Sequence, residues 1–478
     1  MSATVIQFNP APGINSNQRP KVDLNDLLTR HDVPGPRYTS YPTIDQCTES
    51  VGVGALEDAL KGRCLGGLRR PLSLYVHVPF CESVCYYCAC NKVITRKHDR
   101  VSHYLNCLEH EAMLIAKKAA GNLTPVTQFH MGGGTPTFLN DKELLGLVQG
   151  LKMVFPFAAN AEMSIEVDPR TVDENRLAVL AELGFNRLSF GVQDFDPAVQ
   201  KAVHRIQPAD QVFALVEASR RLGFESVNVD LIYGLPLQTP ESFDRTLEQV
   251  KSLRPDRIAL YAYAHLPERF KPQRRIHAQE LPPGAAKVAM LSRSLDALTD
   301  AGYVYIGMDH FALPDDALAV AKRQGRLHRN FQGYSTQADC DLIALGVSSI
   351  GRIGATYSQN AKTLEEYADL LDQGHFPVVR GLALTRDDLI RRSVIMALMC
   401  QGQLHYESIN LAWLVDFKTL FAQELIQLQE MQAQGLVQLS ETGIQVTAMG
   451  WFFVRGVAMV FDRYLQADRH RTRFSKII

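Results

Sequence analysis

Four of the nine cysteines stand between positions 81 and 90, and three of these have a spacing that suits iron–sulfur chemistry. Cys81, Cys85 and Cys88 follow the pattern Cys-x3-Cys-x2-Cys. Three thiolates on one short loop can hold three irons of a [4Fe–4S] cube. The fourth iron then stays open to a small-molecule ligand. The pattern therefore predicts an iron–sulfur cluster that can bind a small molecule at one iron.

A zinc site is the alternative interpretation of these cysteines. Structural zinc sites usually have two pairs of ligands separated by a longer loop, and no second pair with that spacing follows downstream. Cys90 stands only two residues beyond Cys88, so we expect it to be free or catalytic rather than a fourth ligand. The five remaining cysteines are scattered singly, as packing residues are: Cys47, Cys64, Cys107, Cys340 and Cys400.

Glycines and polar residues follow several of the predicted strands. Gly132, Gly133 and Gly134 precede Thr135, and consecutive glycines let a ligand approach the backbone closely. A tight turn explains such a run equally well. Glu166 ends a predicted strand, where a carboxylate can accept hydrogen bonds from ribose hydroxyls. A single polar residue at a strand end is often a helix cap, but several in register indicate a site.

Strands and helices alternate from residue 73 onward, which predicts an α/β fold. Six such units imply a parallel sheet with outside helices, curled by right-handed crossovers into a full or partial barrel. Six strands are two short of a closed eight-stranded barrel, so we expect a partial (β/α)6 TIM-like barrel. A further apolar run at Tyr303–Met308 can add a strand. The predicted strands are Ser73–Val78, Gln128–Met131, Met163–Val167, Arg187–Val192, Ser226–Ile232 and Arg257–Ala264.

The two ends of the chain have a different character from this middle part. Residues 1–50 are predicted to form an N-terminal arm with a short helix at Leu24–Arg30, and residues 51–370 the catalytic domain. Residues 371–478 are predicted to form a mainly helical domain. That domain has helical spacing from Phe417 to Met431, followed by a small β-hairpin of Leu436–Leu439 and Ile444–Thr447.

Composition excludes several classes of protein. A net charge of −1 provides no general basic field for nucleic acid, and the helix-plus-hairpin end carries no concentrated charge. No uninterrupted apolar stretch is long enough to cross a membrane, and Met1–Pro20 does not look like a signal peptide. An odd number of mostly single cysteines is unlike a secreted disulfide framework. We therefore expect a cytoplasmic protein.

The wider context of these motifs resembles one family within the radical S-adenosylmethionine (SAM) superfamily, the oxygen-independent coproporphyrinogen III oxidases (coproporphyrinogen dehydrogenases). The resemblance runs from about Val33 to the C-terminus. The superfamily signature is the CxxxCxxC motif after the first strand. Eight further segments resemble this one family within the superfamily: Arg37–Thr43, Tyr75–Cys81, Cys85–Lys92, Gly132–Thr137, Asp230–Pro236, Gly307–Phe311, His328–Tyr334 and Gly443–Thr447.

The resemblance implies a radical oxidative decarboxylation. Two propionate side chains of coproporphyrinogen III would become vinyl groups, giving protoporphyrinogen IX in anaerobic haem biosynthesis. The propionate β C–H bonds are not acidic enough for a side-chain base, so a cofactor must carry the difficult step. The implied cofactors are a [4Fe–4S] cluster on Cys81, Cys85 and Cys88 and two molecules of SAM. An electron donor of unknown identity and a monomeric state are also implied.

The resemblance also assigns individual residues to the cofactors. It makes Tyr75, Gly133, Glu166 and Ile350 contacts of the first SAM. It makes Tyr87, Gly134, Thr135, Gln193, Arg205, Asp230 and Ala264 contacts of the second SAM. Cys90 receives a catalytic role. The substrate is acidic, so basic residues should line its pocket, with Arg37, Arg274, Arg275 and Arg329 as candidates.

Three alternative functions stay open from the sequence. A haem-binding chaperone of the same fold usually lacks both the fourth cysteine and the Arg37–Thr43 motif, which this chain has. A radical SAM paralogue with another substrate is kept open by two departures from the family pattern, at Ala89 and at Gly456–Met459. A non-catalytic zinc or iron–sulfur interaction protein is disfavoured by the six-strand pattern.

Overall fold

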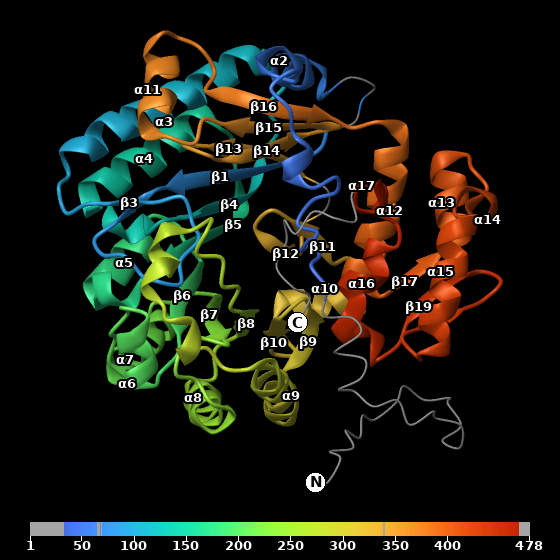
Figure 1. Ribbon diagram of the computed structural model, residues 1–478. Helices are drawn as coiled ribbons and strands as arrows, with labels where there is room; N and C mark the ends of the chain where they lie inside the picture. The colour runs from blue at the N-terminus through green and yellow to red at the C-terminus, as the bar shows by residue number, and fades with distance from the viewer. Residues whose placement is uncertain (1–32, 65–66, 68, 338–339, 468–478) are drawn as a thin grey trace. The chain divides into compact units, whose positions relative to one another are not determined.

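The computed structural model describes residues 33–64, 67, 69–337 and 340–467, which form two compact units (Figure 1). One unit comprises residues 42–389, and the other joins residues 33–41 to residues 390–467. The strand Val378–Ala383 pairs with Thr356–Asn360 and so belongs to the main sheet. The helix predicted at Leu24–Arg30 lies outside the described residues. No helix within the described part of the chain is long and apolar enough to span a membrane.

A twelve-stranded sheet forms the centre of the larger unit, and its middle is the predicted set of six parallel strands. The strand order is β16-β15-β14-β13-β1-β4-β5-β6-β7-β8-β10-β9. The partial barrel is therefore confirmed. The six predicted strands are β1 (Leu72–Val78), β4 (Val126–Gly133), β5 (Phe157–Val167), β6 (Arg187–Gln193), β7 (Ser226–Tyr233) and β8 (Arg257–Ala262).

Both edges of the sheet extend beyond those six strands. The strand predicted at Tyr303–Met308 is present as β9 (Val304–Gly307), which is antiparallel to β10 (His310–Ala312). On the other side, β13 (Asp341–Leu345) pairs in parallel with β1 and was not predicted. Antiparallel strands then continue that edge: β14 (Ile350–Ile353), β15 (Thr356–Asn360) and β16 (Val378–Ala383).

Helices cover the outer face of the sheet (Figure 1). Their starts follow from local sequence: Asn140 and Glu143 form a capping box at α4, and Thr239 caps α8 with Pro240 in its first turn. Their apolar stripes bury against the strands, as Leu144, Leu147 and Leu151 do in α4. The helices are α2 (Val53–Gly62), α3 (Asp99–Ala119), α4 (Asp141–Val154), α5 (Glu174–Glu182), α6 (Pro197–Ala202), α7 (Ala209–Arg221), α8 (Pro240–Leu253), α9 (Gly284–Asp300), α10 (Ala317–Arg323) and α11 (Leu364–Asp372).

The smaller unit is mainly helical and contains the predicted hairpin. The hairpin strands β18 (Val437–Leu439) and β19 (Gly443–Val446) are joined by a third strand, β17 (Gln403–His405). The single helix predicted from Phe417 to Met431 is divided at Phe421 into α14 (Phe417–Leu420) and α15 (Ala422–Ala433). The other helices are α12 (Arg386–Gln401), which crosses the boundary between the units, α13 (Tyr406–Trp413), α16 (Val454–Met459) and α17 (Arg463–Ala467).

Residues 33–41 belong to this smaller unit through specific polar contacts. The buried Tyr38 hydroxyl donates to Asp462 Oδ2 at 2.9 Å, and Arg455 Nε donates to the Pro36 carbonyl at 3.1 Å. Tyr38 and Tyr41 are both buried, so the tyrosines of the Arg37–Thr43 motif act here as packing residues.

Helix α3 carries a buried carboxylate that joins three other elements of the larger unit. Glu111 Oε2 accepts hydrogen bonds from the Gly346 N–H at 2.8 Å and from the Tyr367 hydroxyl at 2.5 Å. Its other oxygen accepts from Asn360 Nδ2 at 2.6 Å. Burial raises the pKa of Glu111 to about 7, although these hydrogen bonds act in the opposite direction.

This raised pKa predicts a pH-dependent contribution to stability. Native Glu111 keeps a proton that the unfolded chain releases above its ordinary pKa of 4.5, so the free energy of unfolding falls as pH rises from 4.5 to 7. In Glu111→Gln the dependence disappears. The stability of the wild type relative to this variant is therefore expected to fall by at most about 3 kcal/mol between pH 5 and pH 8. Anaerobic urea unfolding across this range measures the difference.

Glu109→Gln is the matched control, because Glu109 is an exposed carboxylate on the same helix. Its difference from the wild type should stay constant with pH. Parallel stability curves for the wild type and Glu111→Gln would contradict a proton held by Glu111 in the folded state.

Candidate active site at the cysteine loop

A cavity of about 260 Å³ opens at the carboxyl ends of the parallel strands, where barrels of this kind carry their chemistry. Twelve of the residues predicted to form the site line this cavity: Cys81, Cys85, Tyr87, Cys88, Cys90, Gly133, Gly134, Thr135, Glu166, Gln193, Arg205 and Asp230. It also has lining residues that the sequence analysis did not assign, namely Ser83, Lys92, Pro136, Val167, Asp168, Arg170, Ser189, Gly191 and Tyr261.

The cysteine loop is closed at its base by backbone pairing. Strand β2 (Phe80–Cys81) lies parallel to β3 (Val93–Ile94), and the Thr95 N–H donates to the Cys81 carbonyl at 2.9 Å. Within the loop, the Tyr86 N–H donates to the Val203 carbonyl at 3.0 Å. These hydrogen bonds close the loop that carries all four cysteines and attach it to the residue after helix α6.

The donor set fits an iron–sulfur cluster better than a single zinc ion. Cys81, Cys85 and Cys88 are free thiols on one loop around one cavity. Their spacing offers three thiolates on one loop, one fewer than the four protein ligands of a structural zinc site. The Thr135 hydroxyl donates to Cys81 Sγ at 3.3 Å, and Arg205 Nη1 donates to Cys85 Sγ at 3.5 Å. Such donors stabilise the negative charge of ligating thiolates.

The glycine run forms a close backbone wall beside this loop. Gly133 has φ +118°, and a Cβ there would lie 2.5 Å from the His77 ring. A Cβ at Gly134 would lie 2.6 Å from the Pro79 carbonyl oxygen. The Gly133 N–H donates to Glu166 Oε2 at 3.0 Å. The run is therefore more than a tight turn, because no side chain fits where it faces the loop and the Glu166 carboxylate.

Two carboxylates with opposite pKa shifts face the cavity. Burial alone would raise the pKa of Glu166, but His130, the Gly133 N–H and His77 together leave it below its ordinary value. Burial first, and the charge of Glu166 second, raise the pKa of Asp230 to about 6. Asp230 accepts from Asn228 Nδ2 at 2.9 Å and from the Ser189 hydroxyl at 3.2 Å. The two acids are held ready to accept hydrogen bonds from a polar ligand.

A buried ion-pair group stands next to Cys85. Asp168 Oδ2 lies 3.1 Å from Arg205 Nη1 and 2.7 Å from Arg170 Nη2. Burial would raise the pKa of Asp168, but Arg205 and Arg170 leave it below its ordinary value. Asp168 and Arg170 were not predicted from the sequence. A signal was present, because Asp168 follows Glu166 by two residues, directly after the end of β5, and strand alternation places residues two apart on the same face.

Gln193 lies at an irregular point of the sheet. The pairing register of β6 with β7 shifts between Gly191 and Gln193, and Gln193 has φ +71°. A non-glycine residue in this conformation costs on the order of 1 kcal/mol and is common at functional sites. The bulge directs the Gln193 side chain into the cavity.

Cys90 lies at the mouth of the cavity and interacts with Cys88. A hydrogen bond from Cys90 is the largest cause that lowers the pKa of Cys88 to about 6. Lys92 Nζ donates to the Cys88 carbonyl at 3.0 Å and so holds the end of the loop. Cys90 itself is exposed.

Three predicted SAM contacts do not line this cavity. The Tyr75 hydroxyl bonds with His77 Nδ1 at 3.1 Å, and its ring stacks on His130. Ile350 begins β14. Ala264 lies two residues beyond the end of β8, where its carbonyl accepts from Gln273 Nε2 at 3.2 Å.

Gln273 is a further residue that the sequence analysis missed. The same amide nitrogen also donates to the Tyr87 carbonyl at 3.0 Å, so Gln273 links the cysteine loop to the segment after β8. Its side chain is buried, and nothing in the basic sequence around it signals this role.

The arginines considered for the substrate do not line the cavity either. Arg274 and Arg275 are exposed, and Arg275 lies over the Tyr86 ring at 5.2 Å. Arg329 is buried against the Tyr334 ring. Arg37 belongs to the smaller unit.

Two segments of the chain match known protein families. Residues 75–250 match the radical SAM superfamily, and residues 384–453 match the HemN C-terminal domain. The first range contains the whole cysteine loop and the strands β4 to β7.

Several characterised proteins are similar over almost the whole length. The oxygen-independent coproporphyrinogen III oxidase of Pseudomonas aeruginosa is 48% identical over 455 residues, which cover 95% of this chain and 98% of that protein. The Escherichia coli enzyme of the same name is 48% identical over 452 residues, with the same shares covered. The solved structure of coproporphyrinogen III oxidase (HemN) from Escherichia coli, described as a radical SAM enzyme, superimposes with a TM-score of 0.88 at 47% identity. It covers 93% of this chain and 100% of that one. The chain therefore belongs to the oxygen-independent coproporphyrinogen III oxidase family of radical SAM enzymes.

Proposed function

We propose that this chain converts two propionate side chains of coproporphyrinogen III into vinyl groups, giving protoporphyrinogen IX. Each conversion removes one β hydrogen atom, one electron and CO2 from the substrate. The observation that carries the proposal is the full-length similarity to enzymes of this name, combined with a cysteine loop that lines the cavity at the strand ends.

The chemistry divides between cofactor and protein. A bound [4Fe–4S] cluster and SAM would together supply a radical able to remove a hydrogen atom that no side-chain base could take as a proton. Cys81, Cys85 and Cys88 would hold the cluster. The backbone of Gly132–Gly134 would let SAM approach closely, and Glu166 and Asp230 would orient SAM by accepting hydrogen bonds.

We also propose that two SAM molecules bind, as the sequence resemblance implies. The first would contact Tyr75, Gly133, Glu166 and Ile350. The second would contact Tyr87, Gly134, Thr135, Gln193, Arg205, Asp230 and Ala264. For the second set, six of the seven residues line one cavity, which supports a common ligand. For the first set, Tyr75 supports the assignment indirectly, because its ring stacks on His130 beside Glu166.

Anaerobic turnover tests the proposed reaction. The reconstituted protein, with SAM, a one-electron reductant and coproporphyrinogen III, is expected to release CO2 and to yield protoporphyrin after oxidation of the product. Cleavage of SAM without decarboxylated porphyrin would instead favour a paralogue with another substrate. Stoichiometric haem binding without turnover would favour the haem-binding chaperone.

We propose that Cys90 acts on bound substrate and is not a cluster ligand. Its position on the cavity and its spacing of two residues from Cys88 support this role. Cys90→Ser is expected to keep four irons per chain and to cleave SAM, while vinyl formation falls by about 10²-fold or more. Iron content, 5′-deoxyadenosine and porphyrin products measure the three quantities.

Cys64→Ala serves as the control for Cys90→Ser, because Cys64 is a half-buried cysteine whose thiol bonds only to the Asn122 carbonyl in the described structure. It should leave all three quantities unchanged. If Cys90→Ser loses iron in parallel with activity, Cys90 is a ligand and its proposed role is wrong.

The cellular setting is also a proposal. We infer a cytoplasmic monomer that receives electrons from a separate donor and has no nucleic-acid or membrane partner. The nine cysteines form no disulfide in the described structure, which suits a reducing compartment, and the net charge of −1 offers no general attraction to a polyanion. Sedimentation of the cluster-bound protein tests the monomeric state.

A further inference from the structure

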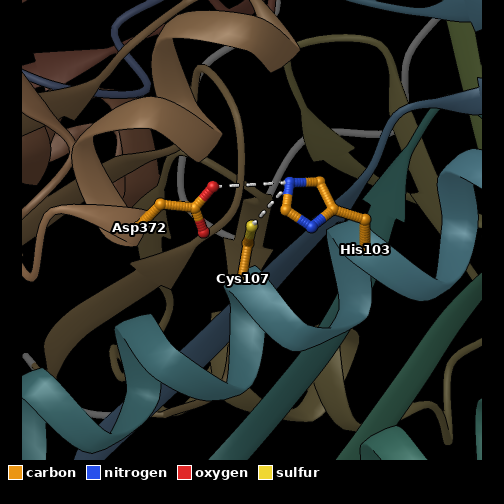
Figure 2. A group of neighbouring side chains, drawn as sticks. All are labelled: His103, Cys107 and Asp372. Atoms are coloured by element: carbon orange, nitrogen blue, oxygen red, sulfur yellow. Dashed lines mark hydrogen bonds and ion pairs between the residues drawn. The ribbon is translucent and has the colours of Figure 1, made fainter.

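A second group of potential metal ligands lies on the outside of the larger unit, on helices α3 and α11 (Figure 2). It consists of His103, Cys107 and Asp372. One ligand atom from each lies within 4.8 Å of the other two. None of the three lines the cavity at the cysteine loop. This group is therefore separate from the proposed active site.

The three side chains converge on one point. His103 Nε2 lies 3.9 Å from Cys107 Sγ and 3.8 Å from Asp372 Oδ2. Around a tetrahedral zinc ion, ligand atoms stand about 3.3–3.6 Å apart, as bond lengths of about 2.0–2.3 Å require. Small side-chain movements would bring the three atoms to these separations. Figure 2 shows the imidazole facing both the thiol and the carboxylate.

Local structure favours this convergence. His103 and Cys107 are four residues apart on α3 and so lie on the same face of the helix, the spacing that helical metal sites use. Asp372 is the last residue of α11. The two helices are also linked by the hydroxyl of Tyr367 on α11, which donates a hydrogen bond to Glu111 on α3.

The donor types and their exposure suit a divalent transition metal. An imidazole, a thiolate and a carboxylate together are typical zinc ligands, and their total charge of about −2 would balance the ion. Cys107 is almost entirely buried, whereas the side chains of His103 and Asp372 are 58% and 60% exposed. A metal would therefore stand above the thiol at the surface, with its fourth position open to water.

The same atoms give little stability without a metal. An exposed ion pair between histidine and aspartate contributes about 0–1 kcal/mol at most. The imidazole nitrogen has no contact shorter than 3.8 Å within the group. The three side chains are thus linked to one another only by long contacts, at 3.8 and 3.9 Å.

We propose that His103, Cys107 and Asp372 bind one zinc ion or a similar divalent transition metal, which joins α11 to α3. Binding would release the Cys107 thiol proton. It would also hold α11 in the position from which Tyr367 reaches Glu111. The site would thus be structural and would support the segment around Gly346, to which Glu111 also binds.

The test uses the full-length protein with its iron–sulfur cluster assembled. The protein is incubated with ZnSO4 under anaerobic conditions, passed over a desalting column with a weak chelator, and analysed for zinc by mass spectrometry. About one zinc per chain is expected, together with a higher thermal midpoint. Zinc K-edge absorption, which iron does not obscure, should show one sulfur at about 2.3 Å and the remaining ligands at about 2.0 Å.

Matched variants locate the ion. His103→Gln and Cys107→Ala are each expected to retain less than a tenth of the wild-type zinc. His110→Gln, on the same helix, and Cys64→Ala should retain all of it. His103 is exposed, so its variant is expected to fold normally even if Cys107→Ala does not. Unchanged zinc in His103→Gln, no zinc in the wild type, or three sulfurs around the zinc would each overturn the proposal.

Discussion

Cys85→Ala is expected to abolish the cleavage of SAM, with a loss of at least about 10³-fold in 5′-deoxyadenosine formation. In the proposed assignment Cys85 would supply one of three thiolate ligands of the cluster, so its removal would leave one iron without a protein ligand. The cofactor carries the difficult step, and no residue of the cavity can replace it. Anaerobic reconstitution followed by iron analysis and quantification of 5′-deoxyadenosine measures both effects.

Cys47→Ala is the control for this prediction, because Cys47 is a buried cysteine that does not line the cavity. It should bind iron and cleave SAM as the wild type does. A Cys85→Ala protein that still binds four irons and cleaves SAM would disprove the assignment of the cluster to this loop.

Arg205→Leu is expected to lower SAM cleavage by about 10²-fold at constant protein concentration. Arg205 joins three parts of the site: it pairs with Asp168, donates to the Gly191 carbonyl, and reaches Cys85 Sγ. Its removal leaves a buried carboxylate with one partner fewer, a loss that costs several kcal/mol in buried pairs. Single-turnover measurement of 5′-deoxyadenosine, with iron content measured in parallel, separates an effect on SAM from loss of the cluster.

Arg170→Leu provides the comparison, because Arg170 pairs with the same Asp168 oxygen but is more exposed, at 21% against 8% for Arg205. Water can replace part of its interaction, so a smaller loss is expected. Equal losses of SAM cleavage in the two variants would contradict a special role for Arg205 at the cysteine loop.

The six central strands could be predicted because each is a short apolar run followed by a helical pattern. Parallel pairing brings their carboxyl ends to one edge, so the amino-acid sequence alone is enough to place Glu166, Gln193 and Asp230 together. Twelve of the predicted site residues meet around one cavity.

Other features could not be predicted from the sequence, because they depend on contacts between segments that are distant along the chain. The strand β13 pairs with β1, from which it is separated by more than 250 positions, and no local pattern signals that neighbour. The helix predicted from 417 to 431 is interrupted at Phe421, whose backbone is not helical (φ −112°, ψ 29°) and whose ring packs on Phe417 and on the distant Phe461. Gln273 shows the same limit for the site, since its importance comes only from reaching both Tyr87 and Ala264.

The short pairing of β2 with β3 has a consequence for the life of the enzyme in a cell exposed to air. The pair ties the two ends of the cysteine loop through backbone hydrogen bonds that involve no metal. A cluster destroyed by oxygen would therefore leave a loop that is still closed and still attached to its sheet. Such a protein does not have to refold before it receives new iron and sulfide, so damage at this site is open to repair.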